Sequence, residues 1–150
     1  MTRMLERILI AVDDSEASDT AVDQGLALAA AEGAEVVLAH VVAIAGERLV
    51  PHDGTPDRVP DGAQTDELVE AAAKAAAVGV PYTTELLVGY PPRQIALLAN
   101  DRDVDLVIVG SRHMSGLKRF LIGSTSRALI GETTRPLLIV PDVALDRVPV

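Results

Sequence analysis

The chain has 150 residues, which favours a single domain around one core. Its formal net charge of −9 argues against general binding to nucleic acid or to anionic membranes, since both attract basic proteins. The absence of cysteine excludes disulfides, thiolate metal ligands and cysteine nucleophiles. Charge appears at Glu6 and Arg7 before any long apolar stretch, and no apolar run approaches the roughly 18 residues of a membrane span, so we expect a cytoplasmic protein.

The first part of the chain predicts a strand–helix–strand unit. Arg7–Val12 is a short β-branched run that ends in a turn or helix cap at Asp13–Ser15. Glu16–Glu32 has the spacing of a helix, and Gly33 is a stop signal. Glu35–Val42 is a second aliphatic run, so the two strands are expected to be parallel and joined by a right-handed crossover.

The segment from about Ala43 to Gln64 interrupts this alternation. It contains three prolines and three glycines, and no apolar periodicity survives in it. About twenty residues without structure are unusual inside a compact domain. We therefore expect a flexible loop over residues 43–64, with a functional lid or an interaction loop as alternatives.

The alternation of helices and strands then resumes to the end of the chain. The expected elements are helix Thr65–Val78, strand Pro81–Val88, helix Pro91–Asn100, strand Val104–Val109, helix Ser124–Gly131 and strand Leu137–Val140. Five strands and four helices in alternation predict one α/β domain over residues 1–150, in which helices cover both faces of an open parallel sheet, as in Rossmann-like folds. Residues 142–150 lack a pattern and are expected to form a C-terminal tail.

The end of the first strand is the first candidate site, because ligands of open α/β sheets bind beyond the carboxyl ends of the strands. Ala11, Val12 and Asp13 lie there, and the Asp13 carboxylate could accept hydrogen bonds from ribose hydroxyls or an adenine amino group. The alternative is that Asp13 or Asp14 only caps the following helix.

The second candidate site is the basic, glycine-rich segment Gly110–Thr125. No acidic residue occurs between Asp105 and Glu132, whereas four arginine or lysine residues do. Glycines let backbone N–H groups approach an anion, and a Gly-Ser-Thr step into a helix adds hydroxyl donors and the positive end of the helix dipole. The segment therefore predicts a phosphate cradle; the alternative is a solvated basic loop. Neither a Walker A motif nor GxGxxG occurs.

These segments resemble the universal stress protein family. The resemblance is carried by RILIAVDDSEAS (Arg7–Ser18), LAHVV (Leu38–Val42), DLVIVGSRHMSGLKRFLIGSTSRALI (Asp105–Ile130) and RPLLIVP (Arg135–Pro141). It implies the strand order 3-2-1-4-5, with the switch point between the first and fourth strands. Nucleotide-binding members carry Gly, two residues, Gly, nine residues, Gly and then Ser or Thr. Gly110 and Gly123-Ser124 match this signature, but His113 stands in place of the middle glycine.

The resemblance also implies which residues bind a nucleotide. The first-strand residues would contact the adenosine part, Val41 would line the adenine pocket, and the glycine-rich segment would hold ribose and phosphates. The candidate residues are Ala11, Val12, Asp13, Val41, Val109, Gly110, Arg112, His113, Gly116, Gly123, Ser124 and Thr125. The implied ligand is ATP or a related adenine nucleotide such as AMP or cyclic AMP, which could bring Mg²⁺ or Mn²⁺ with it.

The resemblance implies a stress-response protein that acts as a regulatory nucleotide-binding module. Family members commonly form homodimers through the last strand, here Leu137, Leu138, Ile139 and Val140. Two alternatives remain: His113 could block the cradle and leave a dimeric interaction protein, or the chain could be a slow ATPase. No arrangement of residues indicates a dedicated catalytic site or a metal site. His40, within an aliphatic strand, is expected to be structural.

Overall fold

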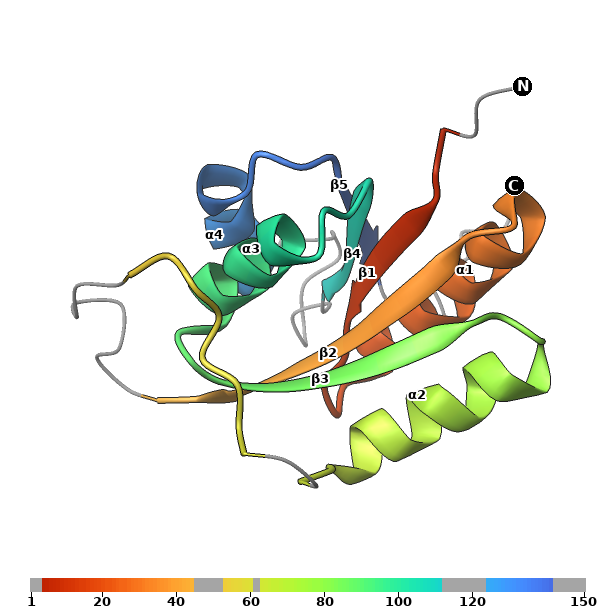
Figure 1. The fold of residues 1–150 in the computed structure, drawn as a ribbon, viewed down its shortest axis with the longest axis horizontal. Coiled ribbons are helices and arrows are strands. Elements are labelled where there is room, and N and C mark those ends of the chain that lie inside the picture. The colour runs from red at the N-terminus through yellow and green to blue at the C-terminus, as the bar shows by residue number, and fades with distance from the viewer. Residues whose placement is uncertain (1–3, 45–52, 61–62, 112–123, 142–150) are drawn as a thin grey trace, which may run out of the picture.

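The computed structural model describes residues 4–44, 53–60, 63–111 and 124–141 (Figure 1). Within these residues, five strands alternate with four helices in the order that the sequence predicts. The elements are β1 (Arg7–Ala11), α1 (Glu16–Glu32), β2 (Glu35–Ala43), α2 (Asp66–Ala77), β3 (Tyr82–Gly89), α3 (Pro91–Asp101), β4 (Leu106–Ser111), α4 (Ser124–Glu132) and β5 (Leu137–Pro141).

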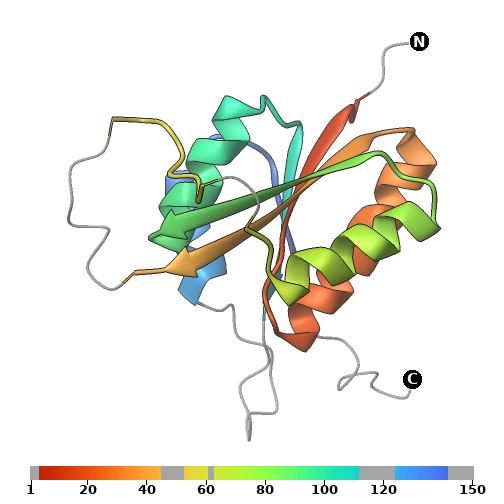
Figure 2. The ribbon, with the colours of Figure 1, turned by 60° about the horizontal axis from the view of Figure 1, so that its bottom comes forward.

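The strands form one sheet of order β3-β2-β1-β4-β5, and each neighbouring pair is parallel. Helices α1 and α2 cover one face, and α3 and α4 cover the other (Figures 1 and 2). The predicted α/β fold and strand order are therefore confirmed. No helix in the described part of the chain is long and apolar enough to cross a membrane.

The central strand β1 supplies both cores. Ile8, Leu9 and Ile10 are completely buried, and they alternate between the two faces of the sheet. Ile8 and Ile10 pack in the cluster beneath α1 and α2, whereas Leu9 packs in the cluster beneath α3 and α4. Because the strand is covered on both sides, it reads in sequence as a continuous aliphatic run.

Local capping sets the ends of α1. The Ser15 hydroxyl accepts a hydrogen bond from the Ser18 N–H at 3.0 Å, so Ser15 is the N-cap. The expectation that Asp13 or Asp14 caps this helix, the alternative to a binding role, is wrong. At the other end Gly33 has a left-handed backbone (φ 69°), in which glycine is favoured, and the helix stops there as predicted.

The fourth strand begins two residues later than the sequence predicts. Val104 is β-branched and begins the aliphatic run, which is why the sequence places it in the strand, and it is indeed buried. Its N–H, however, donates to the carbonyl of Ala99 at 3.0 Å and so closes the end of α3. The ladder with β1 starts at Leu106, opposite Ile8.

Residues 53–60, called the strap below, belong to the segment that we expected to be an irregular loop. Arg58 forms an antiparallel bridge with Leu87 of β3. The strap, drawn in yellow, accordingly runs beside β3 (Figures 1 and 2). The Val59 N–H donates to the Leu86 carbonyl at 2.9 Å, and the Val88 N–H donates to the Asp57 carbonyl at 3.0 Å. The strap thus covers part of the outer edge of β3, an attachment that the sequence did not predict.

Asp105 holds the start of the central strand. Its Oδ2 accepts the backbone N–H groups of Glu6 at 2.8 Å and of Arg7 at 3.0 Å. These hydrogen bonds to a charged acceptor fix the chain just before β1 enters the core.

We expect Asp105→Ala to lower the free energy of unfolding by about 1–3 kcal/mol, because two backbone donors lose their acceptor. Asp105→Asn should lose less, since its amide oxygen can still accept. Urea denaturation of the three proteins measures the difference, and an Ala variant as stable as the wild type would contradict this role.

Candidate functional site

A cavity of about 130 Å³ lies at the carboxyl ends of β1, β2 and β4, between α3 and α4. This is the switch point of the sheet, where successive crossovers run to opposite sides of β1. The residues that line it are Ala11, Val12, Asp13, Ala39, His40, Val41, Pro91, Ile95, Val109, Gly110 and Thr125.

The cavity gathers predicted site residues from four separate parts of the chain. Those that line it are Ala11, Val12, Asp13, Val41, Val109, Gly110 and Thr125. Ser124 is the first residue of α4, directly beside Thr125. Arg112, His113, Gly116 and Gly123 lie outside the described residues.

Part of the cavity wall has no recognisable signal in the sequence. Ala39, Pro91 and Ile95 carry no polar group, so no chemical signal marks them. His40 did carry a signal but was interpreted as structural. Its Nδ1 lies 2.6 Å from the carbonyl oxygen of Val12; since a carbonyl only accepts, this nitrogen is the donor. The bond ties β2 to the end of β1 and supports the structural role.

Asp13 is held in a tight turn at the mouth of the cavity. Its Oδ1 accepts the Ser15 N–H at 2.7 Å, and its own N–H donates to the hydroxyl of Ser18 at 2.8 Å. Ser18 is almost completely buried, so this anchor is protected from water. Oδ2 of Asp13 makes no hydrogen bond within the described residues and is available to a ligand.

Gly110 of β4 packs directly against the first turn of α1. A Cβ added at this position would clash with the Ala17 carbonyl group and would lie 2.7 Å from the Ser18 nitrogen. On the α4 side, the Gly110 carbonyl accepts the Ser126 hydroxyl at 3.3 Å. The packing of α1 therefore requires glycine at this position. The sequence prediction named Gly110 for a different reason, the approach of backbone N–H groups to an anion.

The two helices beside the cavity offer different chemistry. Pro91 and Pro92 open α3 and lack N–H groups, and Tyr90 before them makes no side-chain cap. The α3 wall of the cavity is consequently apolar, formed by Pro91 and Ile95. In contrast, α4 begins at Ser124 and places exposed Thr125 on the cavity, so its helix N-terminus faces this region.

A second, acidic cleft of about 250 Å³ lies between the N-terminal ends of α1 and α2. Its lining residues are Val12, Asp13, Asp14, Asp19, Val22, Asp66, Glu67, Glu70, Ala71 and Lys74. The backbone N–H of Glu67 and the hydroxyl of Thr65 hold the pKa of the Glu67 carboxyl below its usual value. In the part of the chain that the structure describes, no group of three His, Asp or Glu side chains is arranged to hold a metal ion.

The fold and the position of the cavity define a Rossmann-like α/β domain with a switch-point site. The sequence model of the universal stress protein family matches residues 4–141. The chain belongs to this family, which confirms the resemblance noted from the sequence.

Individual relatives agree with this assignment. Universal stress protein YxiE of Bacillus subtilis is 32% identical over 147 residues, with 91% of this chain and 99% of the relative covered. The solved structure of MJ0577 from Methanocaldococcus jannaschii has a TM-score of 0.69 at 24% identity and covers 92% of this chain and 96% of its own. A universal stress protein in complex with cAMP has a TM-score of 0.65 at 23% identity, with 92% and 98% covered. At this identity the structures show a shared fold.

We expect Gly110→Ala to lower the free energy of unfolding by about 1–3 kcal/mol, because the added methyl meets α1 backbone that cannot rotate away. Gly131→Ala in α4 is the matched control. Its added Cβ meets nothing within 4 Å, so it should leave stability unchanged or raise it by up to about 1 kcal/mol. Urea unfolding tests both, and equal stability of the two variants would contradict the packing requirement.

Proposed function

We propose that the chain is a stress-response protein that binds an adenine nucleotide (ATP, AMP or cyclic AMP) as a regulatory module. The observation that carries this proposal is the cavity itself. It collects the end of β1, Val41 of β2, Val109–Gly110 of β4 and Thr125 of α4, to which the family resemblance assigns nucleotide contacts. The family neighbour in complex with cAMP supports an adenine nucleotide as the ligand class.

The chemistry of the cavity walls favours one orientation of a bound nucleotide. An adenine base fits the apolar side made by Val41, Pro91 and Ile95. A ribose hydroxyl can donate to Oδ2 of Asp13, which has no hydrogen bond among the residues that the structure describes. The phosphates then extend toward the N-terminus of α4, where backbone N–H groups and the helix dipole favour negative charge. A divalent cation, Mg²⁺ or Mn²⁺, would enter with the phosphates as its ligands.

We also propose that the chain forms a homodimer through β5, and that it acts in the cytoplasm. In the described sheet, β5 pairs with β4 and forms an edge of the sheet. Leu138 of this strand has 40% of its surface exposed, and an exposed apolar edge strand offers a surface for pairing with a second copy.

Light scattering after size exclusion should accordingly give the mass of a dimer for the wild type. Leu138→Lys should shift the protein toward the monomer, because a charge on the edge strand opposes pairing. Val69→Lys, at an exposed position of α2, is the control and should leave the mass unchanged. A monomeric wild type would rule out this dimer.

Calorimetric titration of nucleotide-stripped protein tests the binding function. We expect saturable binding below millimolar concentration for at least one of ATP, AMP and cyclic AMP. Asp13→Asn should weaken it about tenfold, because the charged acceptor is lost while the amide oxygen can still hold the turn with Ser15. Asp23→Asn removes the same charge from α1 outside the cavity and should bind as the wild type does.

The absence of saturable binding by the wild type would contradict the proposal. In that case His113→Gly separates the remaining possibilities. If this substitution creates binding, His113 blocks the cradle and the chain is an interaction protein. Phosphate release from ATP above that of Ser124→Ala would instead support slow hydrolysis.

A further inference from the structure

We propose that Gln94 of α3 is a positioning residue for the cavity, and that it acts through Asp57 of the strap. This inference rests on the proposed nucleotide site and adds to it an element that lies outside the cavity. In this proposal the strap holds the α3 residues of the cavity wall, Pro91 and Ile95, at the distance from β2 that a bound nucleotide requires.

Gln94 and Asp57 form a two-point contact. The Gln94 side chain is completely buried; its Oε1 accepts the Asp57 backbone N–H at 2.7 Å, and its Nε2 donates to Asp57 Oδ2 at 2.8 Å. A buried amide is expensive to leave without partners, so this contact is strongly favoured once α3 is packed. The two bonds fix both the position and the orientation of Gln94.

The position of Gln94 in α3 connects this contact to the cavity. Pro91 lies three residues before it and Ile95 directly after it, and both line the cavity wall. At the start of α3, its two prolines lack N–H groups and Tyr90 provides no side-chain cap, so the buried contact of Gln94 is one of the anchors of this turn. A contact that holds Gln94 in place therefore also holds Pro91 and Ile95 in the cavity wall.

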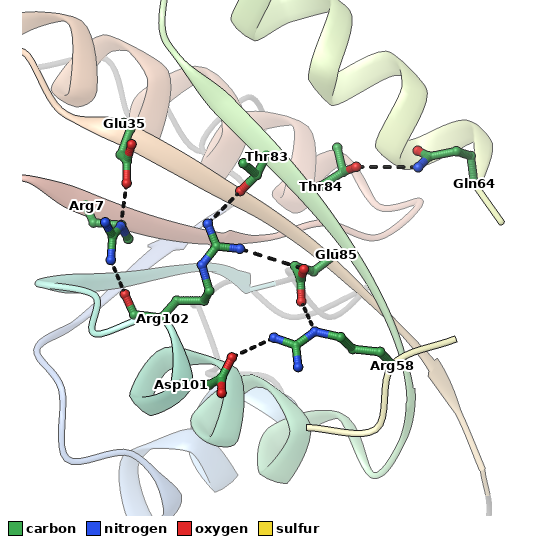
Figure 3. Close-up of polar contacts among 9 residues, drawn as sticks. All are labelled: Arg7, Glu35, Arg58, Gln64, Thr83, Thr84, Glu85, Asp101 and Arg102. Atoms are coloured by element: carbon green, nitrogen blue, oxygen red, sulfur yellow. Dashed lines mark hydrogen bonds and ion pairs between the residues drawn. The ribbon is translucent and has the colours of Figure 1, made fainter. Parts of the chain in front are cut away.

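A second contact joins the strap to the far end of the same helix. The Arg58 guanidinium bonds Glu85 of β3 at 2.7 Å and Asp101 of α3 at 2.6 Å (Figure 3). The hydrogen bond with Asp101, assisted by Glu85, raises the pKa of Arg58 above its usual value, so this cation is retained throughout the physiological range. Together with its ladder bonds to β3, the strap is attached to the sheet and to both ends of α3.

The strap also follows β2 in the chain, and β2 supplies another part of the cavity wall through Val41. The β2–β3 pair and α3 are thus joined by a tie that bypasses the cavity. If α3 is released from the strap, the cavity loses its fixed width, and part of the binding free energy must be used to restore it.

The test compares Gln94→Leu, Asp57→Ala and Asp57→Asn with the wild type. Leu removes both hydrogen bonds, Ala removes one, and Asn keeps an oxygen that can accept from Gln94. Asp105→Ala is the control, because it removes two hydrogen bonds at the opposite end of the sheet and is expected to lower stability without touching the cavity. The readouts are the Kd for AMP and hydrogen exchange of the α3 amides 93–98 in the ligand-free protein.

We expect Gln94→Leu to raise the Kd about tenfold and Asp57→Ala to raise it less, each with faster exchange in α3. Asp57→Asn and Asp105→Ala should keep the Kd within about twofold of the wild type. If Gln94→Leu does not fold, Asp57→Ala carries the test. A folded variant with unchanged Kd and unchanged α3 exchange overturns the positioning role while the proposed function stands. A wild type that binds no nucleotide overturns the proposed function. Faster α3 exchange in the variants would then still support the attachment of α3 to the strap, but not a role of that attachment in binding.

Discussion

The arrangement of the site depends on one close contact, between the first turn of α1 and β4 at Gly110. No side chain fits between this residue and the backbone of Ala17 and Ser18. The contact lets α1 lie directly against the sheet, and it brings the turn after β1 next to β4. Packed interiors do not absorb an extra methyl group easily, so the distance between these elements is fixed rather than adjustable.

Two buried serines extend this contact to the walls of the cavity. Ser18, which lies against Gly110, accepts the N–H of Asp13 and so sets where the Asp13 carboxylate stands. On the other side, Ser126 donates to the Gly110 carbonyl and sets the first turn of α4. The acid and the helix N-terminus, which would meet opposite parts of a nucleotide, are thereby positioned from one residue of β4.

Local signals in the sequence predicted the helices and strands well, whereas they did not predict contacts between residues far apart in the chain. The bounds of α1, Glu16–Glu32, follow from a cap and a left-handed glycine, which are properties of neighbouring residues. The strand order came from the family resemblance, since hydrophobic periodicity predicts where strands lie in the chain but not which strands pair in the sheet. The pairing of Arg58 with Leu87 joins residues 29 positions apart, and the neighbouring Asp57 bonds Gln94, 37 positions further along the chain, so no local pattern predicts either contact. Gly110 was selected correctly but for another reason, because sequence cannot distinguish a glycine required by a helix from one required by a ligand.

The distribution of charge around Asp13 decides how an anionic ligand can lie. Asp13 and Val12 line both the cavity and the acidic cleft between α1 and α2. A phosphate placed toward that cleft would meet several carboxylates, which would repel it. On the α4 side, the chain from Gly110 to Gly131 contains no acid and begins a helix at Ser124. In the proposed complex Asp13 would therefore act as a boundary: its carboxylate would accept a neutral hydroxyl and disfavour phosphate on the α1 side, which leaves the direction toward α4.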